Sequence, residues 1–263
     1  MAKRNVQFRH DETKEVFKLF SHFEAKGLDR GRVFDDWLTA ICCCLSLGTA
    51  EERYLEVAGR YSKGEKGNRG IDVMAQAFAA LIDAMERSGA DILGDFFEGA
   101  ITFGEHGKFF TPEALCEMMA RTTIGDNPPE REDGQPLSIC DPACGSGRTL
   151  LAAAKLVPNA RLYGVDVDER CVKMTAINLA LNGLRGYAVH GNSLSLQEHG
   201  HYSVSRFIPG ALRWATHPIL TVPMVAQPEQ AEVATQAPSP GPVVEEAKLE
   251  PMKPGQLKLF AAA

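Results

Sequence analysis

The stretch Asp141-Pro142-Ala143-Cys144-Gly145-Ser146-Gly147 decides the fold that we expect for this chain. It follows a short apolar run, Leu137 to Cys140, which predicts a strand, and it precedes Leu150 to Val157, which predicts a helix. Glycines in such a turn let the backbone bend tightly and approach a ligand without obstruction by a Cβ atom. A strand, a glycine-rich turn and a helix in this order are typical of the ligand-binding edge of a parallel sheet.

The residues after this turn continue the alternation of strands and helices. Arg161 to Val167 and Tyr187 to His190 predict two further strands, and Val172 to Leu181 predicts the helix between them. Short turns between such elements imply a parallel sheet covered by helices. Asp166 ends the second strand about 20 residues after the glycine turn, where a carboxylate is suited to hold a ribose diol. A general nucleotide-binding turn, or a purely structural one, is the alternative interpretation.

The residues before the turn predict helices. Apolar side chains recur at intervals of three and four within Val16–Phe23, Phe34–Leu45 and Met74–Met85, with Gly89 as an expected stop. Thr111-Pro112-Glu113 predicts another helix start, with a capping hydroxyl, a proline at the first helical position and an acid in the first turn.

The end of the chain has a different composition. Its prolines are Pro223, Pro228, Pro238, Pro240, Pro242, Pro251 and Pro254. Such a segment buries too little apolar surface to offset chain entropy, so we expect a disordered, extended linker. The sequence therefore divides into a helical N-terminal domain (1–106), an α/β domain (107–221) and a disordered segment (222–263) that ends in a short apolar motif.

Composition places the chain among ordinary globular proteins. It has 263 residues, of which 44% are hydrophobic and 24% charged. No apolar run approaches the ~20 residues that span a bilayer, and none follows the basic start in the manner of a signal peptide. We therefore expect a cytoplasmic protein with no membrane partner. The seven cysteines include Cys42, Cys43 and Cys44, whose spacing predicts small buried hydrophobes rather than a metal site.

The net charge of −6 gives no general sign of nucleic-acid binding. A local basic patch could still contact nucleic acid in a chain of negative net charge. Its candidate members are Lys63, Lys66 and Arg69 in a glycine-rich stretch. The alternative for these residues is a solvated loop.

Three pieces of the sequence resemble a known family. The stretch 141–147 resembles the cofactor loop of class I S-adenosylmethionine (SAM)-dependent methyltransferases. Its residues are similar to the form of this loop found in the N6-adenine-specific DNA methylases. Gly107-Lys108-Phe109-Phe110-Thr111-Pro112 resembles the segment with which that family closes over the methionine end of the cofactor. Asp91-Ile92-Leu93-Gly94-Asp95-Phe96-Phe97-Glu98 resembles the preceding helical stretch in type I restriction–modification methylases. The resemblance implies an α/β fold with a partial Rossmann-like sheet.

The resemblance also implies SAM as the cofactor and a role for each matching residue. Asp141 and the backbone of the turn would lie along the methionine part, and Asp166 would accept the ribose hydroxyls. Asn192 stands where the family usually has an aspartate near the adenine ring, so a pure acceptor is replaced by an amide. The expected cofactor-binding residues are Phe109, Thr111, Pro112, Asp141, Ala143, Cys144, Gly145, Ser146, Gly147, Asp166 and Asn192.

The family's transfer motif, Asn/Asp-Pro-Pro-aromatic after the fourth strand, is not found beyond Asn192. Ile219 to Val222 is a candidate fourth strand, but no acceptor pair or aromatic residue follows it. Asn127-Pro128-Pro129-Glu130 lacks the aromatic residue and a preceding strand, so it is interpreted as a loop. Trp214 and Tyr202 offer stacking surfaces or simple packing. The catalytic residues are therefore not assigned.

The resemblance implies a SAM-dependent DNA adenine-N6 methyltransferase, or a subunit of one, whose target choice rests on a separate specificity subunit or is loose. Two alternatives stay open: a non-catalytic SAM-binding relative that regulates DNA metabolism, and a methyltransferase for RNA or small molecules. The final motif, Gln256-Leu257-Lys258-Leu259-Phe260, resembles the peptide with which bacterial replication and repair proteins dock on the sliding clamp. A tail that packs on its own domain is the alternative.

Overall fold

The N-terminal part of the chain is helical in the computed structural model, which describes residues 6–102, 110–125, 127–128, 134–205 and 211–216. Its elements are α1 (Asp11–Glu24), α2 (Arg30–Leu45), α3 (Glu51–Arg60), α4 (Gly70–Ser88), α5 (Ile92–Phe96) and the π-helix η1 (Phe97–Thr102). The three helices that the apolar spacing predicts are confirmed as α1, α2 and α4. Gly89 ends α4 in the left-handed conformation, at φ 64°, and donates its N–H to the Met85 carbonyl.

Aromatic rings fill the centre of this helical part. Phe96 of α5 lies 4.7 Å from the Phe20 ring of α1 and stacks at 5.3 Å on Phe34 of α2. Trp37 packs edge-on against Phe20 and donates its indole N–H to the Met74 carbonyl of α4. Helices α1, α2 and α4 are thus joined around the short α5, which contacts α1 and α4 and whose Phe96 ring stacks on α2.

The second part alternates helices and strands, as predicted. Its elements are α6 (Glu113–Ile124), β1 (Ser138–Asp141), α7 (Arg148–Leu156), β2 (Arg161–Asp166), α8 (Glu169–Leu181), β3 (Arg185–Asn192), β4 (Gln197–Ser205) and β5 (Ala211–Ala215). One detail of α6 differs from our expectation. Pro112 occupies the N-cap position with an extended ψ of 144°, so helical geometry begins at Glu113 and Thr111 does not cap the helix.

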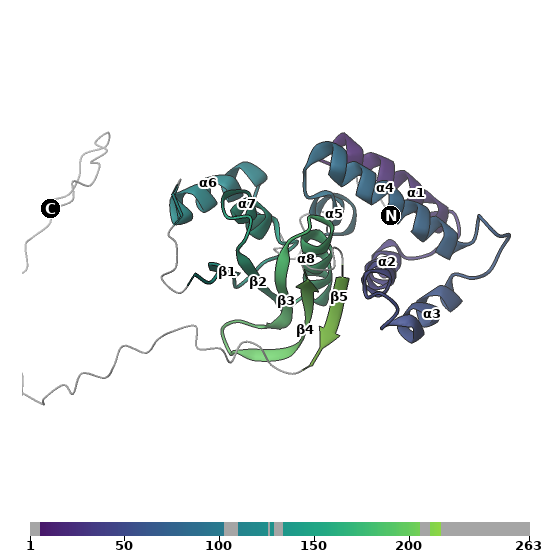
Figure 1. Ribbon diagram of the computed structural model, residues 1–263. Helices are drawn as coiled ribbons and strands as arrows, with labels where there is room; N and C mark the ends of the chain where they lie inside the picture. The colour runs from purple at the N-terminus through teal and green to yellow at the C-terminus, as the bar shows by residue number, and fades with distance from the viewer. Residues whose placement is uncertain (1–5, 103–109, 126, 129–133, 206–210, 217–263) are drawn as a thin grey trace, which may run out of the picture. The chain divides into compact units, whose positions relative to one another are not determined.

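The strands form one sheet in the order β1-β2-β3-β4-β5 (Figure 1). β1, β2 and β3 are parallel, with Cys140 opposite Tyr163 and Tyr163 opposite Tyr187. The three predicted strands are parallel as expected, but β4 and β5, which the sequence did not predict, pair antiparallel, so the sheet is mixed. The candidate fourth strand, 219–222, lies outside the described residues.

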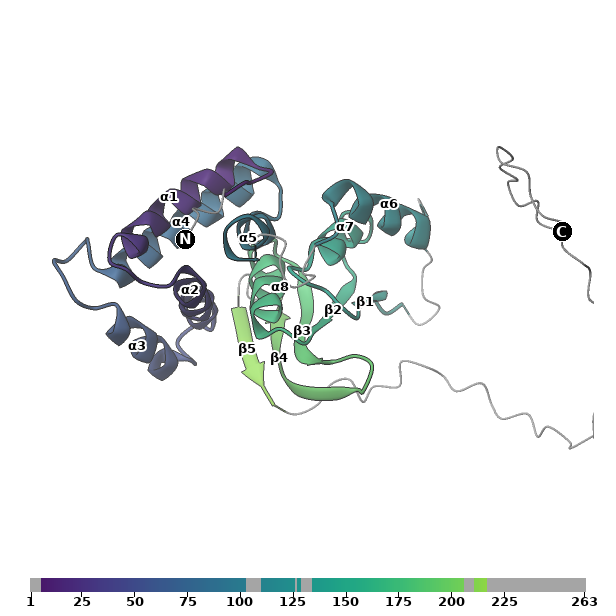
Figure 2. The ribbon, with the colours of Figure 1, turned by 180° about the vertical axis from the view of Figure 1, so that it is seen from behind.

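Helix α8 connects the two parts of the chain. It packs against β2, β3, β4 and β5 and also contacts α2, and the views from both sides show it between the sheet and the N-terminal helices (Figures 1 and 2). Helix α6 lies along α7, which contacts β1 and β2. Buried side chains of the N-terminal helices and of the sheet form a single hydrophobic cluster. The α/β class is therefore confirmed, whereas the boundary at 106/107 stays a prediction.

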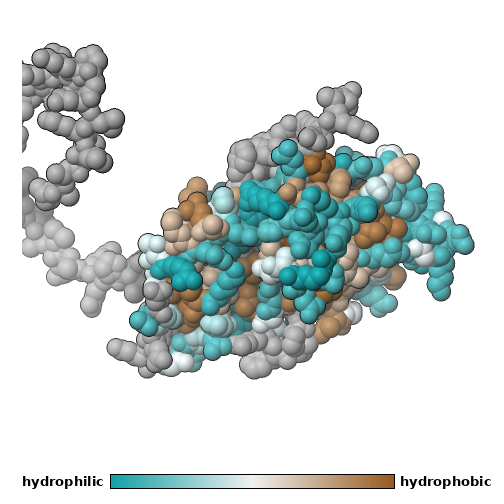
Figure 3. Space-filling model, turned by 90° about the horizontal axis from the view of Figure 1, so that it is seen from above, coloured by the Kyte–Doolittle hydropathy of each residue, from teal (hydrophilic) through white to brown (hydrophobic). Residues whose placement is uncertain are grey.

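The described surface is mixed in character. Hydrophilic residues cover most of the face seen in Figure 3, and hydrophobic residues appear there in separate groups. No helix of the described part combines the length and the apolar character that a membrane span requires. The segment that we predict to be disordered, 222–263, is outside the described residues.

Candidate cofactor-binding site

The turn between β1 and α7 has the backbone that its glycines predict. Gly145 and Gly147 adopt positive φ angles of 55° and 85°. The Gly147 N–H donates to the Cys144 carbonyl at 2.7 Å, and the Cys144 N–H donates to the Val165 carbonyl of β2 at 2.9 Å. A Cβ atom on Gly145 would lie 2.8 Å from the Phe110 ring. Both the dihedral angles and the close contact therefore require glycine.

Asp166 is bonded directly to this turn. One carboxylate oxygen accepts the Gly145 N–H at 2.9 Å, and the other accepts the Asp168 N–H at 2.8 Å. Asp141, at the end of β1, accepts the Ala143 N–H at 3.1 Å. Each acid thus shapes backbone next to the turn, and two carboxylates stand at the carboxyl ends of adjacent parallel strands.

Asn192 ends the third parallel strand at the same edge of the sheet. Its side-chain oxygen accepts the N–H groups of Leu194 at 2.9 Å and Ser195 at 3.3 Å, which closes the turn into β4. The structure therefore gathers Asp141, the glycine turn, Asp166 and Asn192 at the edge where ligands bind in sheets of this kind.

A cavity of about 300 Å³ adjoins the turn on its β1 side. Thr111, Asp141 and Ala143 line it, together with apolar side chains that include Met119, Ile139 and Leu150. Its volume falls at the lower end of the usual range for small-molecule pockets. Pro112 is exposed at the start of α6, and Phe109 lies outside the described residues.

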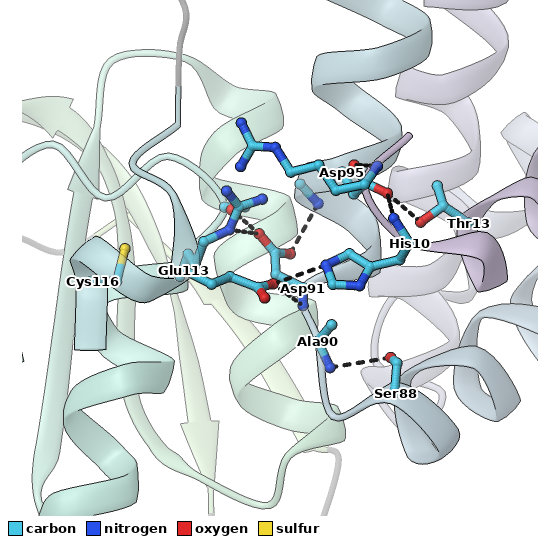
Figure 4. A network of polar contacts seen from close by, with 12 residues as sticks. His10, Thr13, Ser88, Ala90, Asp91, Asp95, Glu113 and Cys116 are labelled. Atoms are coloured by element: carbon cyan, nitrogen blue, oxygen red, sulfur yellow. Dashed lines mark hydrogen bonds and ion pairs between the residues drawn. The ribbon is translucent and has the colours of Figure 1, made fainter. Parts of the chain in front are cut away.

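A buried polar network supports the turn from behind and was not expected from the sequence. Asp91 is 2% exposed and accepts hydrogen bonds from the Ser146 hydroxyl, from Arg148 Nε at 3.1 Å and from Asn178 Nδ2 at 2.8 Å. The same Asn178 amide nitrogen donates to the Ser146 carbonyl at 2.8 Å. Figure 4 shows Asp91 next to Glu113, which also faces His10. The sequence signals at Asp91 were the resemblance of the stretch 91–98 to the family's helical segment and its place before a helix, where it accepts the Gly94 N–H.

Two buried cysteines, Cys144 and Cys116, lie next to the site, and their burial favours the neutral thiol. Burial raises the pKa of Cys144 well above its usual value, and burial likewise raises the pKa of Cys116. Cys42 and Cys43 are buried as predicted, whereas Cys44 is exposed. Among the described residues, no group of three or more His, Cys, Asp or Glu side chains could hold a metal ion.

The other candidate residues have structural partners. Tyr202 is buried and its ring lies 4.7 Å from Trp214, so packing accounts for this pair. Arg69 forms two hydrogen bonds with the Asp72 carboxylate, which neutralises one member of the candidate basic patch. Asn127 and Pro128 lie outside any helix or strand, and Pro129-Glu130 is outside the described residues.

Known proteins resemble the region that holds this site. Residues 88–210 match the N-6 DNA Methylase family. The methylase subunit of the type I restriction enzyme MpnII from Mycoplasma pneumoniae is 26% identical over 114 residues, which are 39% of this chain and 20% of that protein. The MjaIX methylase subunit from Methanocaldococcus jannaschii is 26% identical over 139 residues, or 48% of this chain and 23% of that protein.

A solved structure, the type I restriction-modification methyltransferase subunit from Streptococcus thermophilus, aligns with a TM-score of 0.35 and 16% identity, over 68% of this chain and 57% of that one. The chain spans about a fifth of the length of the two curated relatives. The family match includes the glycine turn, Asp166 and the Asp91 segment. The match covers a little under half of the chain, and within residues 88–210 the chain is similar to the N-6 DNA methylase family.

Proposed function

We propose that the chain binds SAM at the edge formed by Asp141, the glycine turn, Asp166 and Asn192, and serves as the cofactor-binding part of a DNA adenine-N6 methyltransferase. One observation carries the proposal. The N–H of Gly145 is bonded to Asp166, so the close-approach turn and the acid suited to a ribose are a single rigid unit. The match of residues 88–210 to the family supports the same conclusion.

The residues present fit this ligand. A Cβ atom on Gly145 or Gly147 would lie 2.8 Å from Phe110 or 3.1 Å from Thr175, so the turn keeps its tight conformation only with glycine at these positions. The cavity beside Asp141 combines apolar walls with one carboxylate, which suits an aliphatic chain that carries an ammonium group. Asp141 would then hold the methionine part, Asp166 the ribose and Asn192 the adenine.

SAM supplies an electrophilic methyl group when it is bound. The chain's own contribution is to orient that group: the turn and Asp141 would hold the methionine end of the ligand, Asp166 the ribose and Asn192 the adenine end. No described residue is assigned to the acceptor amine. We therefore propose that another polypeptide completes the acceptor side and selects the DNA target, in keeping with relatives that are named as subunits.

Calorimetry tests the binding step. SAM is titrated into the wild-type protein, into Asp166→Ala and into Glu117→Gln as a control at an exposed acid of α6. We expect binding to the wild type and the control, and weakened binding to Asp166→Ala. Absence of heat with the wild-type protein would contradict the proposal.

Transfer is tested separately with labelled SAM and mixed-sequence DNA, with and without a specificity subunit. Incorporation into adenine supports the enzyme. Binding without transfer under both conditions would favour a non-catalytic SAM-binding protein. Labelling of RNA or small molecules would favour a methyltransferase for those substrates.

The C-terminal motif Gln256-Leu257-Lys258-Leu259-Phe260 is the basis of a second proposal, docking on a bacterial sliding clamp. Its support is the pattern of apolar anchors after a glutamine. Fluorescence anisotropy of the labelled peptide with purified clamp tests it, and a peptide with Leu259→Ala and Phe260→Ala is the control. Equal signals from the two peptides would contradict it.

A further inference from the structure

Arg148 occupies an unusual position at the site. It is the first residue of α7, directly after Gly147, and its side chain is 6% exposed. A cation at a helix N-terminus opposes the helix dipole, so stabilisation of α7 does not explain it. Burial disfavours its charge, but the carboxylates of Asp91 and Glu98 outweigh this effect and raise the pKa of Arg148, which remains a buried cation.

The guanidinium joins three separate segments. Its Nε donates to Asp91 at 3.1 Å, its Nη2 lies 3.4 Å from Glu98 of η1, and its Nη1 donates to the Thr111 carbonyl at 3.0 Å. The Asp91 part of this network is drawn in Figure 4. Two carboxylates therefore hold the guanidinium in a fixed orientation while it bonds to the backbone before α6.

Glu98 holds the same backbone from the other side. Its second oxygen accepts the Phe110 N–H at 2.9 Å. The Phe110 ring stacks on Phe97 at 5.6 Å and lies 5.8 Å from the Arg148 guanidinium. The N–H of Phe110 and the carbonyl of Thr111 are thus both bonded to one ion pair, and this fixes the segment 110–111.

The position of this segment determines the shape of the candidate site. The Phe110 ring covers Gly145, since a Cβ there would be 2.8 Å from it, and Thr111 lines the cavity. We propose that Arg148 and Glu98 are positioning residues, which hold Phe110 and Thr111 over the glycine turn so that the ligand site is preformed. This inference rests on the proposed function, because the ligand whose affinity a preformed site would raise is SAM.

Two conservative variants test the clamp formed by Arg148 and Glu98. Arg148→Lys keeps the charge but cannot reach Asp91, Glu98 and Thr111 together. Glu98→Gln keeps an oxygen for the Phe110 N–H but loses the charge that faces Arg148. Lys155→Gln is the matched control, since Lys155 lies on the same helix and pairs with Glu117 at the exposed surface.

The first readout is amide hydrogen exchange of peptides that cover 110–116, measured without any ligand. We expect faster exchange there in both clamp variants and unchanged exchange in the control. The second readout is the Kd for SAM, measured where circular dichroism shows each variant to be folded. If the segment is in place about one-tenth of the time, the apparent Kd rises about tenfold.

The outcomes separate the two proposals. Wild-type protein that fails to bind SAM overturns the proposed function, and the exchange experiment still tests the clamp. Folded clamp variants with wild-type exchange at 110–116 and a wild-type Kd overturn the inference. A lower melting temperature with an unchanged Kd also overturns it, because that result indicates a structural role alone. If Arg148→Lys does not fold, Glu98→Gln decides the question.

Discussion

The N–H of Gly145 donates to the carboxylate of Asp166 at 2.9 Å, across a separation of 21 residues. This bond joins the turn after β1 to the end of β2, so the glycine turn and the acid move as one unit. Asp166→Ala removes both this bond and the one from Asp168.

We expect Asp166→Ala to weaken SAM binding by about 10- to 100-fold, because a hydrogen bond to a charged group contributes ~1.5–3 kcal/mol. Titration calorimetry measures the change. An affinity for SAM equal to that of the wild type would exclude Asp166 from the site.

The glycine turn itself has a matched pair of variants. Gly145→Ala places a Cβ against Phe110 at a φ of 55°, and we expect it to lower the free energy of unfolding by about 1–3 kcal/mol. Gly59→Ala, in α3 with no atom within 4 Å of the new Cβ, should instead raise it by roughly 0.5–1 kcal/mol. Urea denaturation compares them, and equal effects of the two substitutions would show that the turn is not constrained.

The aromatic rings at the centre of the helical part should contribute strongly to the free energy of unfolding. Phe96→Ala removes a ring that contacts α1 and α2, and we expect a loss of about 3–5 kcal/mol in the free energy of unfolding. Leu115→Ala, at a site that is 41% exposed, should change it by no more than ~0.5 kcal/mol. Chemical denaturation followed by circular dichroism measures both, and a Phe96→Ala loss as small as that of Leu115→Ala would contradict the packing described here.

The predicted α/β domain, 107–221, lacks Asp91, which bonds to Ser146 and Arg148 within it. It also lacks Phe96, which packs against helices α1 and α2. Because the buried side chains of both parts form one cluster, we expect this fragment to be unfolded when expressed alone. Proton spectra with wide amide dispersion from the fragment would instead establish it as an independent domain.

Stability should fall at alkaline pH. Burial raises the pKa of the Cys42 thiol to about 12, above its value in the unfolded chain. Between the unfolded pKa and pH 12 the unfolded thiol loses its proton while the folded one keeps it, so folding is favoured less as the pH rises, by up to ~1.4 kcal/mol per pH unit. The free energy of unfolding, measured by denaturation at pH 8 to 11, should decline less steeply with pH in Cys42→Ala than in the wild type. The same slope in both proteins would mean that the thiol is not buried in this way.

Local sequence patterns predicted the elements that depend on nearby residues. The apolar run before Asp141 and the glycines after it determine a strand and a turn within a few residues of each other. The helices α1, α2 and α4 likewise follow from apolar spacing, because α1 and α4 each bury one face and α2 is buried on most sides.

Features that depend on distant residues were missed. Asp91 meets Ser146 across 55 residues, and nothing near Asp91 indicates that contact. The hairpin of β4 and β5 was missed because its first residues are polar, Gln197-Glu198-His199-Gly200-His201. Glu198 and His201 are buried there as a pair at 3.0 Å, which only the folded chain makes possible.

Calorimetric titration of SAM into the wild-type protein and Asp166→Ala is the most direct measurement of the central claim. We predict saturable binding to the wild type and at least tenfold weaker binding to the variant, an affinity ratio that corresponds to about 1.4 kcal/mol. No heat with the wild-type protein, or identical isotherms for the two, would contradict the assignment of this edge as a SAM site.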